Sequence, residues 1–324
     1  MLSTATPRLM HFRLDPGGSQ AVLSACLSTV HAVPKLRSLH LASLQIMSLP
    51  ALRLLSSMKD IDSLHFAITG IYPTDFCGFR NLRTLHMYVV DGSALPILHA
   101  YSSPNLQRLV LMLIAWEAPR DPDDAKLTAQ MLAQRFPSME SLYWQFVIVD
   151  TEPLETTLHP LFALHLREVV FTFHLASFRG VSDSFFGEVA KAWKRLTRLS
   201  VVSSPFSRGP IDPSESETSS HVLSIHAKGC PHLEELELWE MKVVHTEEQA
   251  LERPVQGHPL RSLKVVNFAA TSAEEHACAL LIDRLFPALE VAKTPKPGKE
   301  IWLRWYKVLR EVYTFQRRRY NPSS

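Results

Sequence analysis

Apolar and polar residues alternate in short stretches that recur along the whole chain. The recurring pattern is Leu-x-x-Leu-x-Leu, with other apolar residues often replacing leucine, and its centre has the period of two expected of a strand with one buried face. The ten instances are LMHFRL from Leu9, LRSLHL from Leu36, IDSLHF from Ile61, LRTLHM from Leu82, LQRLVL from Leu106, MESLYW from Met139, LREVVF from Leu166, LTRLSV from Leu196, LEELEL from Leu233 and LRSLKV from Leu260. Successive instances start 21 to 37 residues apart, which indicates a structural repeat.

The segments between these strands have helical spacing of their apolar residues. Helices are expected within residues 19–34, 92–104, 123–137, 183–195 and 272–287, and several of these segments open on Ser, Asp or Gly, which suit an N-cap. A strand followed by an antiparallel helix, repeated many times, stacks into a solenoid. The sequence therefore predicts an α/β leucine-rich-repeat solenoid, with a curved parallel sheet on the concave face and helices on the convex face.

We expect residues 1–292 to form this solenoid, with about ten to eleven irregular repeats and a degenerate last one from Leu289. Residues 293–324 are expected to form a linker, an amphipathic helix and a basic tail. A solenoid leaves an apolar edge at its last repeat, so this helix is predicted to cap it. Its predicted apolar face consists of Trp302, Trp305, Tyr306, Leu309, Val312 and Tyr313.

The register of the repeat predicts which strand residues face outward. The central outward column reads Arg13, His40, His65, His86, Val110, Tyr143, Val170, Ser200, Glu237 and Lys264. The next column reads Asp15, Ala42, Ala67, Tyr88, Met112, Gln145, Thr172, Val202, Trp239 and Val266. These columns contain an apolar, aromatic-containing strip, which a solitary protein would normally keep polar.

This strip is the candidate partner-binding surface, because tyrosine and tryptophan often anchor protein interfaces. Its residues are Tyr88, Val110, Met112, Tyr143, Val170, Val202 and Trp239. Acidic residues on a late strand, Glu235 and Glu237 with Glu234 and Glu240, are expected to orient a protein partner, opposite an N-terminal end that carries Arg13, Arg37 and Arg83. The alternative is that the strands are out of this register and bury part of the strip.

Three histidines, His40, His65 and His86, occupy the same position in successive repeats. They suggest either a metal site or a pH-responsive patch, with an ordinary solvated face as the simplest alternative. No carboxylate or cysteine in the same columns would complete a metal site, so no metal and no cofactor is expected. Protonation of neighbouring imidazoles would be opposed by their mutual repulsion, which favours the pH interpretation over the metal one.

Composition narrows the function class. The formal net charge is only +2, so neither nucleic acid nor a membrane is the expected partner, although Arg317, Arg318 and Arg319 form a short basic tail. The four cysteines, Cys26, Cys77, Cys230 and Cys278, are far apart, which suggests neither a disulfide framework nor a zinc ribbon.

The longest apolar run, residues 109–116, is too short to span a bilayer, and we expect a cytoplasmic or nuclear location. No nucleophile elbow, phosphate loop or zinc-protease helix is found in the sequence, so we expect no enzymatic activity.

The irregular repeat lengths and the recurring SPNLQRL, FPSMESL, CPHLEEL and FPALE segments resemble the leucine-rich-repeat region of fungal F-box-like proteins. The resemblance covers nearly the whole chain and implies that the repeats recognise a protein target, while an F-box would dock a ubiquitin-ligase scaffold. Only eight residues precede the first predicted strand, too few for an F-box. A ligase link is therefore expected only if a missing N-terminal F-box exists. The uncapped edge of the first strand is expected to need a missing domain or a second chain, or to mark a fragmentary gene product.

Overall fold

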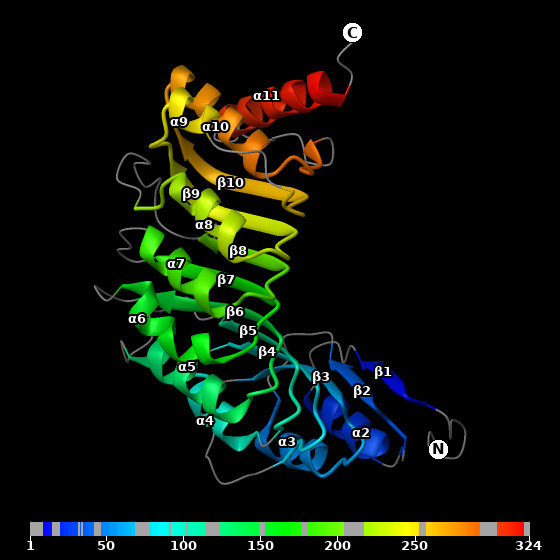
Figure 1. The fold of residues 1–324 in the computed structure, drawn as a ribbon. Coiled ribbons are helices and arrows are strands. Elements are labelled where there is room, and N and C mark those ends of the chain that lie inside the picture. The colour runs from blue at the N-terminus through cyan, green and yellow to red at the C-terminus, as the bar shows by residue number, and fades with distance from the viewer. Residues whose placement is uncertain are drawn as a thin grey trace. The chain divides into compact units, whose positions relative to one another are not determined.

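The computed structural model describes residues 9–14, 20–31, 33, 35–41, 47–68, 78–90, 92–101, 103–113, 123–148, 153–175, 181–203, 217–252, 257–291 and 303–320. Ten strands follow one another in the order β1 to β10, and neighbouring strands within β1–β6 and within β7–β10 run parallel. Helices lie along one side of the strands (Figure 1). This topology confirms the predicted α/β leucine-rich-repeat solenoid.

The chain divides into two compact units, which we describe separately. Unit 1 comprises residues 1–149 and 158–165, and unit 2 comprises residues 150–157 and 166–324. The strands of unit 1 are β1 His11–Leu14, β2 Ser38–Leu41, β3 Ser63–Ile68, β4 Thr84–Val89, β5 Arg108–Leu113 and β6 Ser141–Ile148. Its helices are α2 Gln20–His31, α3 Leu49–Ser56, α4 Leu95–Ala100, α5 Asp124–Arg135 and the short η1 His159–Ala163.

Unit 2 repeats the same strand and helix alternation. Its strands are β7 Glu168–Leu175, β8 Arg198–Ser203, β9 Glu235–Lys242 and β10 Ser262–Ala269. Its helices are α7 Asp183–Ala192, α8 His221–Gly229, α9 Glu247–Leu251, α10 Ser272–Leu285 and α11 Leu303–Tyr320, and α6 Leu154–Leu158 lies at the boundary in sequence. Among the described helices, none combines the length and the apolar character needed to cross a membrane.

The leucines of the repeat pattern form the core of unit 1. Leu39, Leu64, Leu85, Leu109 and Leu142 occupy equivalent positions on neighbouring strands, and each is at most 1% exposed. Complete burial of one such side chain stabilises the fold by about 1.5–3 kcal/mol relative to leaving it exposed. The alternate residues of the same strands, His40, His65 and His86 among them, remain partly exposed.

A ladder of backbone hydrogen bonds fixes the register just before each strand. In unit 1 the carbonyl of Arg37 accepts hydrogen bonds from the amides of Asp62 and Ser63, at 2.9 and 3.1 Å. The carbonyl of Asp62 in turn accepts from the amides of Arg83 and Thr84, at 2.7 and 2.9 Å. We call this repeated arrangement the start ladder. Within each unit it aligns each strand to its neighbour without offset, so equivalent repeat positions form columns.

The ten predicted strands are all present, whereas the degenerate eleventh repeat forms no strand within the described residues. Leu289 is buried as predicted, and the amide of Glu290 still donates to the carbonyl of Arg261 at 2.8 Å, in the manner of the start ladder. Val291 then enters a short helical turn. The predicted boundary between residues 292 and 293 lies outside the described residues.

The C-terminal helix α11 packs on α10 and β10, the last elements of unit 2. Trp305 is 1% exposed, with its ring centroid 5.2 Å from that of Phe268 on β10. Arg319 pairs with Asp283 of α10, and the Gln316 side-chain amide donates to the carbonyl of Pro287 at 3.3 Å. We propose that α11 is the cap of the last repeat.

The buried face of α11 is rotated from the predicted one. Tyr313 was expected on the apolar face but is 48% exposed, while Val308 is fully buried. The buried stripe therefore consists of Trp305, Val308, Leu309 and Val312, which are three or four residues apart and face α10 and β10. Tyr313 lies at the border of this stripe and points toward solvent. Trp302 lies outside the described residues.

Replacing Trp305 by alanine should destabilise unit 2 by about 3–5 kcal/mol, since it deletes a fully buried aromatic side chain and leaves a cavity against Phe268. Tyr313→Ala on the same helix is the matched control and should change stability by no more than about 0.5 kcal/mol. Chemical denaturation of the three proteins measures both effects. Equal losses for the two variants would show that α11 does not cap the fold.

Candidate functional site

The face of the sheet away from the helices, here called the open face, carries the predicted central column in unit 1. Strand register places Arg13 opposite His40, His40 opposite His65 and His65 opposite His86. His86 is in turn opposite Val110, and Val110 is opposite Tyr143. The side chains of His40, His65, His86, Val110 and Tyr143 are all partly exposed.

The second predicted column lies beside the first in unit 1. Tyr88 is opposite Met112, and Met112 is opposite Gln145, each with a partly exposed side chain. Ala67 was expected to face outward as well, but it is only 1% exposed. Ala67 lies opposite Tyr88 in the strand register, and its short side chain is not accessible beside that larger residue. Ala67 therefore contributes no surface to a binding site. Asp15 and Ala42 lie outside the described residues.

Four apolar or aromatic residues of the predicted strip therefore share one continuous patch of unit 1. They are Tyr88 on β4, Val110 and Met112 on β5, and Tyr143 on β6. Neighbouring parallel strands lie about 4.8 Å apart, so side chains from β4 and β6 are close enough to contact one ligand surface. We call these four residues the tyrosine patch.

The open face of unit 2 carries the rest of the predicted strip, and it is more covered. Val170 and Trp239 are partly exposed, but Ser200 and Thr172, which were predicted to face outward, are 2% and 9% exposed. The Trp239 indole nitrogen is itself buried and has no hydrogen-bond partner among the described residues. Trp239 can thus offer a partner its ring but not its N–H group.

The acidic residues of β9 are already engaged within unit 2. Glu237 accepts a hydrogen bond from Ser200 at 2.9 Å and pairs with Lys264, while Glu235 pairs with Arg198 at 3.3 Å. Glu240, predicted with them as part of a surface cluster, is instead only 2% exposed. The alternation of exposure in β9 ends there, because Glu240 and the following Met241 are both buried.

The three histidines form a contiguous row in unit 1. The ring centroids of His40 and His65 are 3.9 Å apart, and those of His65 and His86 are 5.3 Å apart. The His65 ring also stacks on Tyr88, with 5.2 Å between centroids and 28° between planes. The histidine row is therefore continuous with the tyrosine patch.

The environment of the row disfavours protonation. Partial burial lowers the pKa of His65 to about 4, assisted by the charges that His40, His86 and Arg13 would place beside its imidazolium form. Burial and Arg13 lower the pKa of His40, and burial, Arg108 and His40 lower that of His86. At neutral pH the row is thus a set of neutral, neighbouring rings, tilted relative to one another, that can pack against an apolar surface.

Across the described ranges, no group of three or more His, Cys, Asp or Glu side chains is placed to hold a metal ion.

Cys230 and Cys278 are fully buried, and burial raises the pKa of the Cys230 thiol to about 11, so it is protonated and unreactive at neutral pH. His226 beside it is 0% exposed, and burial lowers its pKa to about 3.

Comparison with known proteins finds no matching family model. No curated protein matches the sequence either. Among solved structures, the chain is similar to an internalin, inlF, from Listeria monocytogenes, with 15% identity over 86% of this chain and 67% of that chain and a TM-score of 0.47. It is also similar to the structure of PEPR1-AtPEP1, with 15% identity, 84% of this chain, 36% of that chain and a TM-score of 0.36. These similarities are too distant to support a functional argument, and this chain spans about a third of the second one.

Stability should fall as the pH is lowered, and His65 should contribute measurably to that fall. Its folded pKa of about 4 lies below the ordinary value of 6.5, so the unfolded chain binds more protons between these values. The contribution is fully present above pH 6.5 and is lost as the pH drops toward 4. His65→Gln removes it, so its melting temperature should fall less than that of the parent, by a few degrees, between pH 7 and pH 4.5.

His99→Gln, which changes an exposed histidine on α4, is the matched control and should follow the parent profile. Both variants retain His226, whose lowered pKa also makes the fold less stable as the pH falls. The contribution of His65 is therefore the difference between the pH profiles of melting temperature of the parent and of His65→Gln. Identical slopes for the parent and His65→Gln would contradict the assigned environment of the row.

Proposed function

We propose that this chain is a non-catalytic recognition module that binds a protein partner on the open face of its sheet. The observation that carries the proposal is the tyrosine patch of unit 1. Strand register aligns Tyr88, Val110, Met112 and Tyr143 on the open face, where they remain partly exposed. The residues that alternate with them along each strand point to the opposite side of the sheet and are buried. Large, rigid aromatic side chains bind a partner with little loss of conformational entropy, which supports their role as anchors.

In unit 2, Val170 and Trp239 are proposed as secondary contacts. Glu235 and Glu237 flank Trp239 on β9, and their pairing with Arg198 and Lys264 holds their carboxylates in fixed positions. A partly exposed pair of this kind contributes little net affinity but orients an approaching partner. These residues are therefore proposed to set specificity, and the tyrosine patch to supply most of the affinity.

The role that we propose is similar to that of the target-recognition region of an F-box-like protein, cytoplasmic or nuclear. This part rests on the sequence resemblance of the repeat segments. Recognition of a target does not itself require an F-box, so the proposal for the open face is independent of any ubiquitin-ligase link. Such a link requires an F-box outside the repeats described here.

A double substitution, Tyr88→Ala with Tyr143→Ala, should abolish capture of the partner, since removal of two interface anchors commonly costs about 2 kcal/mol or more each. The measurement is quantitative affinity capture from an extract of the source cells, with bound proteins identified by mass spectrometry. Trp239→Ala should reduce capture less than the double substitution does.

Leu127→Ala is the matched control, because Leu127 is a large apolar residue of unit 1 that is 41% exposed on α5, in the helix layer. It should retain the full set of captured proteins. Circular dichroism and melting temperature must show that all variants remain folded. Recovery of the same proteins by the intact chain and by the double variant would overturn the proposed function.

A second candidate function is pH-dependent binding on the same face, and the stacking of His65 on Tyr88 favours it. A partner that covers the tyrosine patch also removes the histidine row from water and opposes its protonation further. Arg13, His40, His86 and Arg108 are the charged or titratable groups that act on the row, and none is acidic. Binding should therefore weaken as the pH falls.

Capture of the partner at pH 7.5 and pH 5.0 tests this candidate. We expect capture to fall several-fold at pH 5.0 for the intact chain and to fall less for His65→Gln. Equal capture of the partner at both pH values would exclude the pH candidate while leaving the recognition proposal intact.

A further inference from the structure

We propose that the edge of the sheet where the strands of unit 1 begin is a second binding site, for an extended acidic segment of a protein partner. A groove of about 580 Å³ lies along this edge, and we call it the start groove. Its lining residues are Met10, Lys35, Arg37, Lys59, Asp60, Asp62, Asn81, Arg83 and Asn105. They all belong to unit 1, and none is part of the tyrosine patch.

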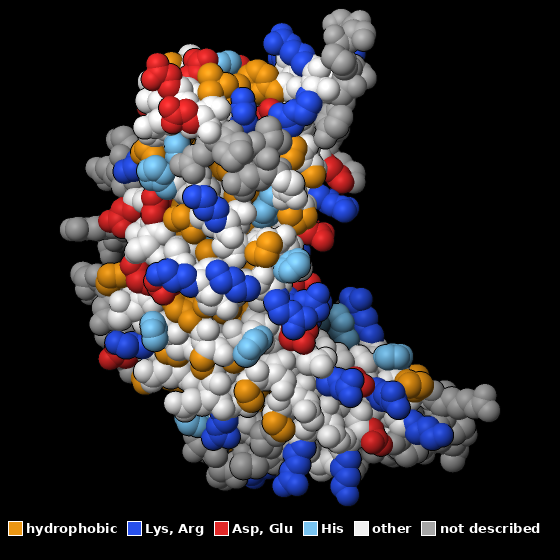
Figure 2. All heavy atoms as spheres, in the orientation of Figure 1, with side chains coloured by type: hydrophobic (Ala, Val, Ile, Leu, Met, Phe, Trp, Pro, Cys, Tyr) orange, Lys and Arg blue, Asp and Glu red, His pale blue; other side chains and the backbone are white. Residues whose placement is uncertain are grey.

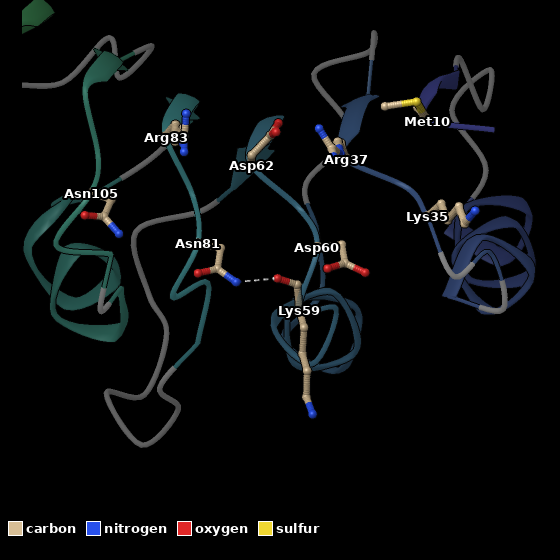
Figure 3. A pocket seen from close by; sticks show the side chains of 9 residues that line it. All are labelled: Met10, Lys35, Arg37, Lys59, Asp60, Asp62, Asn81, Arg83 and Asn105. Atoms are coloured by element: carbon tan, nitrogen blue, oxygen red, sulfur yellow. Dashed lines mark hydrogen bonds between the residues drawn. The ribbon is translucent and has the colours of Figure 1, made fainter. Parts of the chain in front are cut away.

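The repeat itself assembles the groove. The start ladder places Arg37, Asp62 and Arg83 in one row, because each provides the carbonyl that accepts from the next repeat. Two residues earlier in each repeat, Lys35, Asp60, Asn81 and Asn105 form a second row. Figure 3 shows the two rows side by side, with Arg37, Asp62 and Arg83 projecting from the strand starts.

No ion pair with a described residue neutralises the arginines of the groove. Arg37 and Arg83 flank Asp62 on neighbouring strands, yet none of the three forms an ion pair with another described residue. This differs from unit 2, where Arg198, Lys264 and Arg319 are each paired with an acidic residue. The side chains of Lys35, Arg37 and Arg83 against two carboxylates leave the start groove with a formal charge of +1, since the Lys59 side chain points away from the two rows (Figure 3). Figure 2 shows Lys and Arg side chains gathered where Figure 1 places the first strands.

The uncharged groups of the groove match a peptide backbone. Asn105 offers both a donor and an acceptor, and Asn81 retains its side-chain oxygen after donating to the carbonyl of Lys59 at 2.7 Å. Asp60 and Asp62 are acceptors for backbone N–H groups. Acidic side chains of the same segment would accept from Arg37 and Arg83, whose forked donors suit carboxylates.

The dimensions suit a short extended segment. From Lys35 to Asn105 the groove crosses four repeats, or about 14 Å at a strand spacing of about 4.8 Å. An extended chain rises about 3.3 Å per residue, so roughly four to five residues fill it. Nucleic acid fits less well, because none of the described residues that line the groove is aromatic, so no ring is offered for base stacking.

The test uses the full chain and a fluorescein-labelled hexapeptide of alternating Glu and Gly, with a Gln-Gly hexapeptide as the uncharged probe. Fluorescence anisotropy at about 50 mM salt should show binding of the acidic probe and at least severalfold weaker binding of the uncharged one. Arg37→Gln with Arg83→Gln should weaken binding of the acidic probe about fivefold or more. Asp62→Asn should strengthen it about twofold, since it removes a repelling charge and keeps an acceptor oxygen.

Arg135→Gln with Arg310→Gln is the matched control, because it removes the same charge from exposed positions outside the groove and should leave binding unchanged. The Tyr88→Ala, Tyr143→Ala variant should also bind the probe normally, which separates this site from the tyrosine patch. Binding that is indifferent to the groove substitutions, or an oligothymidylate that competes through Arg37 and Arg83 better than the acidic probe, would overturn the proposal.

Discussion

The start ladder is the constraint on which the rest of the structure depends. Within each unit, every described strand after the first is joined to its predecessor by backbone amides that bond one carbonyl, as Asp62 and Ser63 do with Arg37. Because backbone groups make this connection, it tolerates any side chain at the ladder positions. The buried leucines supply the stabilisation, and the ladder supplies the alignment. Columns of side chains on the open face and rows at the strand starts are both consequences of this alignment.

Alignment explains why much of the fold and the open face could be predicted from the sequence. A strand with one buried face has a strict period of two, so the positions of Leu39 and Leu64 determine that His40 and His65 are neighbours. Burial of each outward residue was harder to predict. Ser200 and Thr172 have small side chains and are almost completely buried, whereas Glu240 is in phase with the buried Leu236 and Leu238 and therefore lies on the inward side of β9. The burial of Ser200 and Thr172 depends on packing between neighbouring repeats, which cannot be predicted from the pattern of a single strand.

The start groove was missed for a different reason. Its residues precede the strands, where period-two reasoning does not apply, so the sequence predicts Arg37 and Arg83 only as part of a basic N-terminal end and not as the lining of a groove. The signal was nevertheless present in the repeats, since Lys35 and Arg37 flank Leu36 as Asp60 and Asp62 flank Ile61. These positions therefore form columns at the strand starts, as the outward residues do on the open face. For α11, the periodicity of apolar residues predicted the helix correctly. It did not predict which side of the helix is buried, so Tyr313 was assigned to the wrong side.

The two units use charge differently, and this difference shapes the functional account. The acidic residues of β9 in unit 2 are paired with Arg198 and Lys264, whereas Arg37 and Arg83 of unit 1 have no acidic partner among the described residues. Within unit 1, neutral histidines adjoin the tyrosine patch and cations border the strand starts. The open face of unit 1 thus suits an apolar surface of a partner, and the start groove suits an acidic segment. A single partner with both features would bind unit 1 alone.

The central claim is that the tyrosine patch contacts another protein, and site-specific photocrosslinking tests it most directly. A benzophenone amino acid is placed at Tyr143 in one variant and at Leu127 of α5 in another, and both are irradiated in cells. The account predicts a defined covalent adduct with a second protein from position 143 and none from position 127. No adduct from position 143, or the same adducts from both positions, would contradict it.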